Sequence, residues 1–344
     1  MPTRKFLYGQ TLSQLETLCK ELEMPRFTAK QIARWLYDKH MPTIDAMSNL
    51  SARHRALLAE THEVGFIAPE KVSVSADGTK KYLYRTSQGH YIESAYIPDG
   101  DRATLCISSQ AGCRMGCRFC ATGRQGLQHS LSTNEILNQI GSLPEREQLS
   151  NVVFMGMGEP LDNMDNLLPA LEILTSEWGF GWSPTRITVS TAGVASQLER
   201  FLNSTQVHLA VSLHNPFSDE RAEIMPIEKA WPIRKVVEIL RTYDFTHQRR
   251  VSFEYIVMSG LNDSPRHIRE ICRLLDGIKC RINLIRFHKI PGSPYFSPDD
   301  GAMLRLRDSL TSKGIHTTIR TSRGEDIQAA CGLLSTARSG SAQF

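Results

Sequence analysis

The sequence has no apolar run that approaches the roughly 18 residues of a membrane-spanning helix. Its first residues carry basic side chains, but they lack the apolar segment and the small-residue cleavage site of a secretory signal. The chain also contains no internal repeat and no low-complexity segment. These absences predict a cytoplasmic protein that makes no contact with a membrane.

The chain has little excess charge of either sign. Its 40 lysines and arginines nearly balance its 36 aspartates and glutamates, which leaves a net charge of +4. This balance allows a nucleic-acid partner but does not by itself indicate one. Apolar residues make up 41% of the chain, an ordinary share for a globular protein with a hydrophobic core.

Residues 1–65 are predicted to form a small helical module. Leucines recur there at helical spacing, Thr28 and Gln31 form a capping-box pattern before a second helix, and a third helix is predicted over 52–61. Several basic residues lie in these helices, so one face of the module either contacts RNA phosphates or is an ordinary solvated surface.

The rest of the chain divides into two predicted parts and a tail. Alternating runs separated by turn dipeptides predict a small antiparallel β extension over 66–100. Residues 101–335 alternate strand and helix, which predicts an α/β domain, and the spacing favours a partial (β/α)₆ barrel over a flat doubly wound sheet. We expect residues 336–344 to be a flexible tail. The predicted barrel strands are 104–108, 151–155, 186–190, 207–213, 251–257, 281–287 and 316–320.

Three of the eight cysteines stand close together in a glycine-containing segment after the first predicted strand. Cys113, Cys117 and Cys120 have C-x₃-C-x₂-C spacing, and no fourth cysteine follows nearby. Three thiolates can hold three corners of a [4Fe–4S] cluster and leave one iron open to a small molecule. A structural zinc site normally has four ligands, and here only His129 offers itself as a fourth.

A second motif follows the next predicted strand. Gly156 and Gly158 allow close backbone approach to a ligand, and the carboxylate of Glu159 can meet an ammonium group. A dinucleotide-binding loop is the alternative, but Leu161 stands where that fingerprint requires its third glycine.

The cysteine spacing resembles the signature of the radical S-adenosylmethionine (SAM) superfamily. Within it, the chain resembles the RlmN/Cfr family of dual-specificity RNA methyltransferases from the N-terminal helices to Cys331. The segments that carry this resemblance are 93–98, 102–113, 156–161, 189–193, 210–214 and 330–332.

The resemblance implies a radical SAM barrel with a [4Fe–4S] cluster held by Cys113, Cys117 and Cys120, and two SAM molecules per turnover. It implies methylation at C2 of an adenosine in the peptidyl-transferase centre of 23S rRNA (position 2503), with adenosine 37 of tRNA as a second candidate substrate. The implied partners are these RNAs, a flavodoxin or ferredoxin as electron donor, and a thiol reductant. We expect the protein to act as a monomer.

Three further residues acquire roles from the resemblance. Cys331 is the implied carrier of an S-methyl group, and Cys106 is the implied resolving thiol that forms a transient disulfide with it. Glu93 is the implied proton acceptor for the adenine proton. Taken alone, Cys106 would more often be a core cysteine of a strand, and Glu93 would by default be a solvated edge carboxylate.

The resemblance also implies a set of SAM contacts that follow the predicted strands, where α/β barrels gather their active-site groups. At one of these positions, His288, better-known members carry asparagine, which changes the pattern of donors and acceptors. The implied SAM-binding residues are Gly158, Glu159, Ser190, Ser212, Leu213, His214 and His288.

Basic and aromatic residues around the same rim are candidates to hold RNA phosphates and stack on bases. The basic candidates are Arg249, Arg250, Arg281, Arg286, Lys289, Arg320 and Arg323. Three alternatives stay open from sequence: methylation at C8, a radical SAM tRNA-modifying enzyme of another type, and a metal-stabilised RNA-binding protein without catalysis.

Overall fold

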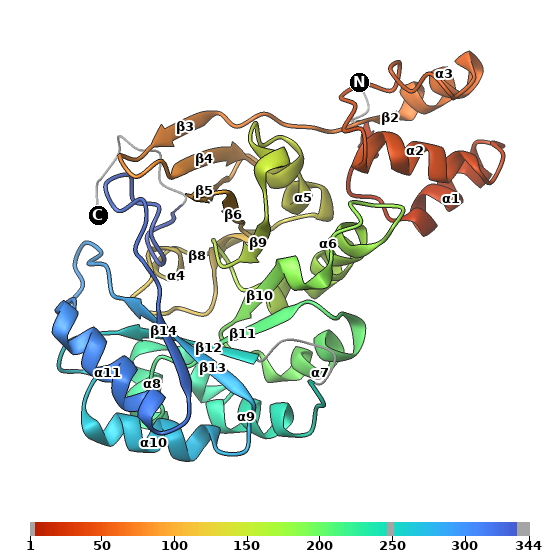
Figure 1. The fold of residues 1–344 in the computed structure, drawn as a ribbon. Coiled ribbons are helices and arrows are strands. Elements are labelled where there is room, and N and C mark those ends of the chain that lie inside the picture. The colour runs from red at the N-terminus through yellow and green to blue at the C-terminus, as the bar shows by residue number, and fades with distance from the viewer. Residues whose placement is uncertain (1–3, 246–250, 336–344) are drawn as a thin grey trace.

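The computed structural model describes residues 4–245 and 251–335, and within them ten strands form one mixed sheet (Figure 1). Seven of the ten are neighbours that pair in parallel, in the order β6, β9, β10, β11, β12, β13, β14. All seven match predicted strands. Their bounds are β6 Arg102–Cys106, β9 Asn151–Phe154, β10 Ile187–Thr191, β11 His208–Ser212, β12 Val251–Val257, β13 Cys280–Arg286 and β14 His316–Ile319.

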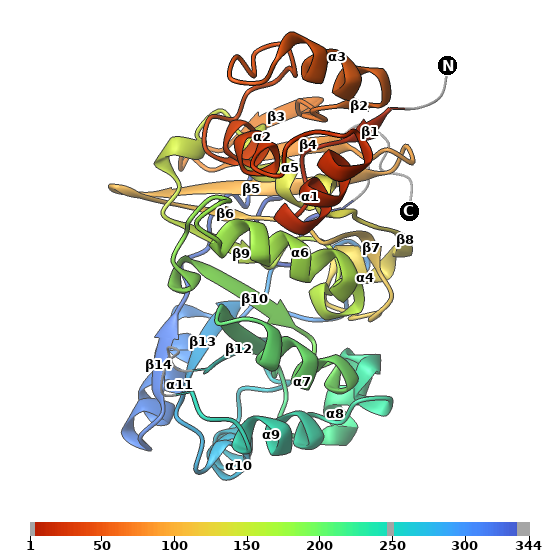
Figure 2. The same cartoon turned by 90° about the vertical axis from the view of Figure 1, so that its right-hand side faces the viewer.

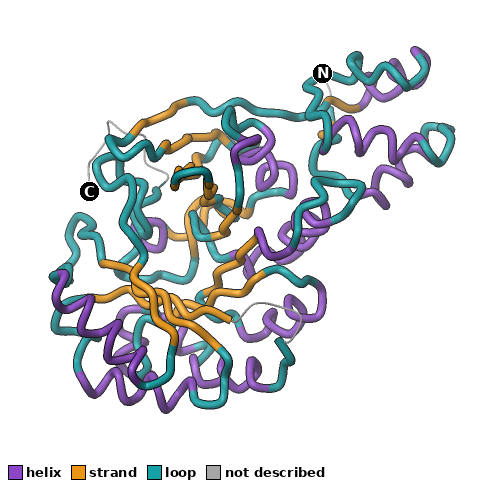
Figure 3. Tube along the Cα trace, viewed as in Figure 1, coloured by secondary structure: helices purple, strands orange, loops and turns teal. Residues whose placement is uncertain are grey.

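Helices connect the parallel strands and lie along the outside of the sheet, as the purple and orange segments of Figure 3 show. Their apolar faces are buried against it; α9, for example, buries Ile233, Val236, Val237 and Leu240. β14 and β3 end the sheet on opposite sides, so the barrel stays open. The predicted partial (β/α)₆ barrel is confirmed. The connecting helices are α5 Thr133–Gly141, α6 Met164–Thr175, α7 Ala195–Ser204, α8 Ser218–Ile224, α9 Ile233–Arg241, α10 Pro265–Leu275 and α11 Asp300–Ser312.

The antiparallel strands are continuous with the barrel sheet rather than forming a sheet of their own. β3 (Lys71–Val74), β4 (Lys80–Arg85) and β5 (Tyr91–Asp99) form a meander whose last strand pairs with β6. Alternating patterns identify such strands but not the partner of an edge, so the sequence did not reveal this continuity. As a result, Glu93 on β5 and Cys106 on β6 lie on adjacent strands.

The N-terminal helices form a group at one end of the molecule, beside α5 and α6 (Figures 1 and 2). Tyr8 connects the group to α5, because its carbonyl accepts a hydrogen bond of 2.9 Å from Nδ2 of Asn134. The elements of the group are β1 Lys5–Phe6, α1 Leu12–Glu21, α2 Thr28–Tyr37, α3 Ala52–Thr61 and β2 His62–Glu63.

The capping box predicted at Thr28 is wrong. The N-cap of α2 is Phe27, which makes no side-chain cap hydrogen bond and already has helical dihedral angles. The turn begins earlier, since the Thr28 amide donates to the carbonyl of Pro25 over 2.9 Å, and the Thr28 side chain is buried. A true capping box occurs at the start of α1, where Thr11 and Gln14 bond reciprocally.

A short hairpin frames the cysteine segment and was not predicted. Its strands, β7 (Gln110–Cys113) and β8 (Gly126–Ser130), pair in antiparallel fashion around the one-turn helix α4 (Ala121–Arg124). The pairing of β7 with β8 fixes both ends of the segment that carries Cys117 and Cys120. Short 3-10 turns complete the described elements: η1 Arg146–Gln148, η2 Pro160–Asn163, η3 Pro184–Arg186 and η4 Pro226–Lys229.

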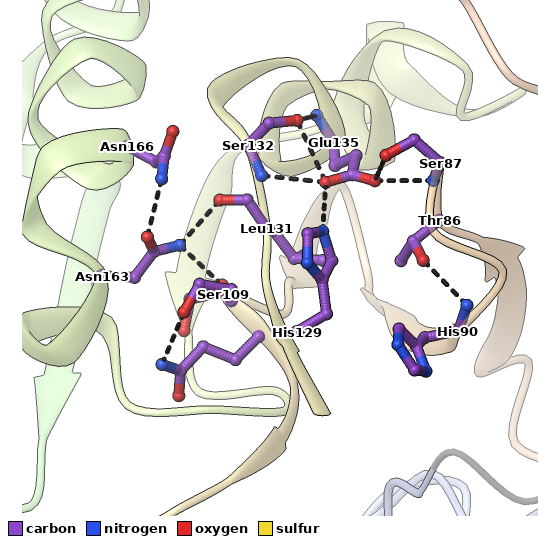
Figure 4. A network of polar contacts seen from close by, with 12 residues as sticks. Thr86, Ser87, His90, Ser109, His129, Leu131, Ser132, Glu135, Asn163 and Asn166 are labelled. Atoms are coloured by element: carbon purple, nitrogen blue, oxygen red, sulfur yellow. Dashed lines mark hydrogen bonds and ion pairs between the residues drawn. The ribbon is translucent and has the colours of Figure 1, made fainter. Parts of the chain in front are cut away.

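Glu135 joins three segments: the turn after β4, strand β8 and the start of α5 (Figure 4). Ser132 and Glu135 form the capping box of α5, which the spacing of a serine and a glutamate three residues apart before an apolar run predicts from the sequence. The Glu135 carboxylate also accepts from the amide of Ser87 over 2.8 Å, and its Oε2 lies 3.0 Å from Nε2 of His129. Burial raises the pKa of Glu135, but hydrogen bonds from Ser132, Ser87 and His129 together hold this pKa below its usual value.

We predict that Glu135→Gln destabilises the protein by about 1–3 kcal/mol near neutral pH, because an amide cannot accept all of these bonds. A carboxylate with a depressed folded-state pKa contributes stability above its unfolded pKa and loses it as pH falls through the folded pKa. The difference between wild type and variant should therefore shrink in acid. Anaerobic urea unfolding across the pH range measures it. Glu147→Gln, at a carboxylate whose side chain is 80% exposed, is the control and should change stability little.

Candidate active site

A cavity of about 400 Å³ opens where the loops after the parallel strands meet. Chain segments from β6 to the residues after β14 contribute to it, which agrees with the rule that barrel sites form at the carboxyl ends of strands. Most of the predicted site residues line it together: Cys106, Cys113, Cys117, Cys120, Gly158, Glu159, Ser190, Ser212, His214, His288 and Cys331.

Two predicted residues do not line this cavity. The side chain of Leu213 is wholly buried in the hydrophobic core. Glu93 is 3% exposed and lies against the segment that carries Cys331, where it accepts a hydrogen bond from the Ser335 amide. Any contact of Leu213 with a ligand would therefore involve its backbone.

The three clustered cysteines share one wall of the cavity. Cys113 ends β7, and Cys120 is the N-cap of α4. Gly123 lets α4 approach this turn, because a Cβ there would lie 2.9 Å from the backbone of Cys117. Burial raises the pKa of the Cys113 thiol to about 12, and nearby thiols and carboxylates add to the effect. Three thiolates held here therefore need a compensating cation, and a metal cluster supplies one.

The donors of this loop are three thiols, and cysteine thiolates are the usual ligands of iron–sulfur clusters. Within residues 4–245 and 251–335, no three His, Cys, Asp or Glu side chains are grouped around a position for one metal ion. His129, the candidate fourth zinc ligand, bonds to Glu135 instead. Cys113, Cys117 and Cys120 could thus hold three corners of a [4Fe–4S] cluster.

Glu159 and Gly158 form a second wall. Glu159 is buried, and its two carboxylate oxygens accept from the amides of Leu161 and Ala192 over 3.0 and 2.6 Å. Burial raises its pKa to about 7. Gly158 has φ +98°, and a Cβ there would lie 2.5 Å from the side chain of Gln110. The remaining lone pairs of Glu159 can accept from an ammonium group.

His214 is held as a neutral ring. Its Nδ1 accepts from the Ile256 amide over 3.0 Å, and Phe119 lies edge-on at 5.0 Å. Burial and the nearby Arg221 lower its pKa to about 3. Its Nε2 therefore carries the proton and can donate to a ligand.

Sequence reasoning missed Arg221, which fixes the ends of two neighbouring strands. Its guanidinium is fully buried, pairs with Glu228, and donates to the carbonyls of Ala192, Ser212 and Leu213 over 2.8–2.9 Å. No motif marks this arginine, because its role depends on three carbonyls that only the fold brings together.

His288 faces the cavity, but both ring nitrogens have protein partners. Nε2 lies 3.0 Å from Oγ of Ser322, and Nδ1 lies 3.5 Å from a carboxylate oxygen of Glu325. Burial lowers the pKa of this ring. His288 thus connects β13 to the segment that carries Cys331.

Glu93 makes two strong contacts. Its Oε1 lies 2.9 Å from Nζ of Lys81, and its Oε2 accepts from the Ser335 amide over 2.9 Å. Burial raises the pKa of Glu93, and the positive charge of Lys81 opposes this. A carboxylate in this setting is suited to accept a proton.

Cys106 and Cys331 lie close together although they are distant in sequence. Cys106 is 7% exposed and packs with Ala95 and Ala329, whereas Cys331 is exposed. The segment of Cys331 is fixed beside the cluster cysteines, since the carbonyl of Gly332 accepts from the Ala121 amide over 2.8 Å. Both cysteines are free thiols.

The opposite side of this segment is tied to the β3–β4 turn. The amide of Gly324 donates to Asp77 over 2.9 Å, and Ser75 donates to Asp326 over 2.6 Å. Figure 1 shows the blue segment after β14 running toward this turn. Cys331 is therefore presented at the cavity by contacts on both sides.

Of the basic rim candidates, Arg320 and Arg323 line the cavity. Arg249 and Arg250, like the tail after residue 335, lie outside the described residues. Among the helices of the described ranges, none combines the length and hydrophobicity that crossing a bilayer requires.

Comparisons with known proteins give a consistent family. Residues 107–275 match the radical SAM superfamily, and residues 6–64 match the ribosomal RNA large subunit methyltransferase N-terminal domain. A probable dual-specificity RNA methyltransferase RlmN of Bacteroides thetaiotaomicron is 57% identical, with 96% of each chain covered. Its counterpart in Phocaeicola vulgatus is also 57% identical, over 96% of this chain and 95% of that one.

A solved structure agrees with these relatives. The crystal structure of a radical SAM methyltransferase from Sphaerobacter thermophilus superposes with a TM-score of 0.90 at 38% identity, and covers 97% of this chain and 100% of its own. Because such relatives match nearly the whole length, the chain belongs to the RlmN family of radical SAM RNA methyltransferases.

Proposed function

We propose that this enzyme methylates C2 of an adenosine in 23S rRNA, with Cys331 as the carrier of the new carbon. The observation that supports this most is that Cys331, Cys106 and the three clustered cysteines line one cavity. The N-terminal module of ribosomal RNA methyltransferase type favours C2 over C8. Adenosine 37 of tRNA is a second proposed substrate, because related proteins are named as dual-specific.

The family uses a [4Fe–4S] cluster and SAM. In this chain Cys113, Cys117 and Cys120 would hold the cluster. Bound together, the reduced cluster and SAM supply a 5′-deoxyadenosyl radical. Glu159 and Gly158 would receive the amino end of SAM, since a buried carboxylate and an open backbone lie there. Further SAM contacts are proposed for Ser190, Ser212, His214 and His288, and for the backbone of Leu213.

Cys331 would act first as a nucleophile and then as a carbon donor. The exposed Cys331 sulfur, as a thiolate, would attack the methyl carbon of one SAM, which gives an S-methyl thioether and releases S-adenosylhomocysteine. Loss of one hydrogen atom from that methyl group leaves a carbon radical that bonds to the adenine ring. The segment of Cys331, anchored on both sides, holds this carbon at the cavity.

Glu93 and Cys106 would complete the reaction. After the carbon radical has bonded to the ring, the adduct would lose one electron to the oxidised cluster, and Glu93 would accept the proton that leaves the adenine carbon. The positive charge of Lys81 favours the ionised carboxylate that this step needs. Cys106 then attacks the Cys331 sulfur, which releases the methylated RNA and leaves a disulfide. A thiol reductant restores the thiols, and a flavodoxin or ferredoxin is the proposed electron donor.

We further propose that the protein is a cytoplasmic monomer. It would have an RNA-binding module over 1–65, an extension over 66–100 and a barrel over 101–335.

We predict that Cys106→Ala expressed in cells accumulates as a covalent protein–RNA adduct, because the resolving thiol is missing. Denaturing gels and mass spectrometry of nuclease-treated protein would locate a methylene-linked adenine on Cys331. The double variant with Cys331→Ala should show no adduct but the same iron content. Recovery of free Cys106→Ala protein alone would contradict the two-cysteine function. The site of the linkage, C2 or C8, identifies the methylated carbon.

We predict that Lys81→Met moves the acid limb of the pH profile of RNA methylation to higher pH. Removing the positive charge raises the pKa of Glu93, so a smaller fraction of this base is ionised at any given pH. Lys80→Met is the matched control, since the neighbouring lysine pairs with Glu145 instead. An acid limb that is unchanged in Lys81→Met would argue against Glu93 as the proton acceptor.

A further inference from the structure

Arg320 occupies a position that the proposed steps leave unexplained. It directly follows β14 and lines the cavity together with Cys106 and Cys331. Its amide donates to the carbonyl of Leu284 over 2.9 Å, which fixes its backbone beside β13. Its Nη1 lies 3.0 Å from Sδ of Met155. The guanidinium therefore points into the site, against the residues that surround Cys106.

A buried anion holds this guanidinium in place. Oε2 of Glu254, on β12, lies 3.7 Å from Nη1 of Arg320 and has no hydrogen-bond partner among the described residues. The other oxygen, Oε1, accepts from Nδ2 of Asn283 over 2.7 Å and lies 3.2 Å from Oγ of Ser252. Glu254 is 3% exposed, so its charge needs a cation nearby. The Glu254 carboxylate and the Met155 sulfur thus orient the Arg320 guanidinium.

The surroundings of Cys106 otherwise oppose ionisation. Its neighbours on β5 and β9 are Ala95 and Val153, and Ala329 and Met155 complete an apolar cluster. A thiol must become a thiolate to attack sulfur, and apolar surroundings disfavour that charge. A cation beside this cluster is the feature that can compensate.

We infer that Arg320 is a positioning residue for the release step, where its guanidinium stabilises the Cys106 thiolate that attacks the sulfur of Cys331. This inference rests on the proposed two-cysteine function. It gives the arginine a role beyond the RNA contacts expected of the basic rim.

The charges acting on Cys106 change in favour of this step. In the free protein, burial raises its pKa to about 12, the charge of Cys331 raises it as well, and Arg320 lowers it. Once Cys331 carries a carbon its sulfur is a thioether that cannot ionise, so it cannot place a negative charge beside Cys106, while the arginine remains. The lowering of the Cys106 pKa by Arg320 is therefore least opposed in the adduct, which is the state that needs the Cys106 thiolate.

The release step conserves atoms, electrons and protons. An S–S bond forms between Cys106 and Cys331, and the bond from the Cys331 sulfur to the methylene carbon breaks. The electron pair of that bond goes to the carbon, which takes up a proton and becomes the methyl group of the product. The proton that Cys106 gives up balances this uptake. A thiol reductant then supplies two electrons and two protons to restore both cysteines.

The test follows the adduct in Arg320→Gln, which keeps hydrogen-bond donors but removes the charge. At saturating RNA, which removes any effect of a lost RNA contact on binding, we expect the adduct still to form and to be released about tenfold more slowly near neutral pH, as for a thiol pKa raised by one unit. Release should recover as pH rises. Arg320→Lys, which keeps the charge, should restore most of the rate. Arg305→Gln, at a side chain that is 74% exposed on α11, is the matched control.

Iron content and SAM cleavage without RNA show whether each variant is folded. Release at the wild-type rate in Arg320→Gln would overturn the inference, and so would failure of a folded variant to form the adduct. If the glutamine variant does not fold, Arg320→Lys decides: tenfold slower release would overturn the inference, and near-normal release would support it. Cys106→Ala run in parallel separates the two claims, because its failure to trap an adduct would refute the proposed function itself.

Discussion

Parallel hydrogen bonding between neighbouring strands is the constraint on which the site depends. In the barrel sheet, β6 and the strands from β9 to β14 run in the same direction, so the loops after them emerge at the same edge of the sheet. The cysteine loop, the Gly158–Glu159 turn, His214 and the Cys331 segment therefore meet although long stretches of chain separate them. Buried Arg221 reinforces this by holding the carbonyls at the ends of β10 and β11.

The antiparallel extension adds a second requirement. Because β5 pairs with β6, the carboxylate of Glu93 and the thiol of Cys106 stand on adjacent strands, and the β3–β4 turn reaches the segment of Cys331. One exposed cysteine is thus placed between the cluster cysteines on one side and a buried thiol and carboxylate on the other. In the proposed mechanism, the carbon on Cys331 first reacts beside the cluster cysteines, Glu93 then takes the adenine proton, and Cys106 finally attacks the Cys331 sulfur.

Sequence patterns predicted what local periodicity and spacing encode. The seven parallel strands, the helices between them and the cap at Ser132 were all identified this way. The three clustered cysteines were found by spacing, and the resemblance added Cys106 and Cys331, which the fold brings into one cavity. What escaped prediction depends on contacts between distant segments: the pairing of β5 with β6, the three carbonyls on Arg221, and the anion behind Arg320. Thr28 shows a local failure, because a capping pattern cannot reveal that the preceding turn is already helical.

The central claim is that the methyl group passes through the sulfur of Cys331 and loses a hydrogen atom there. Supplying the cells with methionine that carries a CD₃ group tests it most directly, with mass spectrometry of the methylated adenosine as the readout. The account predicts a methyl group with two deuterium atoms and one hydrogen, because one deuterium leaves with 5′-deoxyadenosine and a solvent proton replaces it. A product that keeps all three deuterium atoms would mean direct transfer from SAM and would contradict the account.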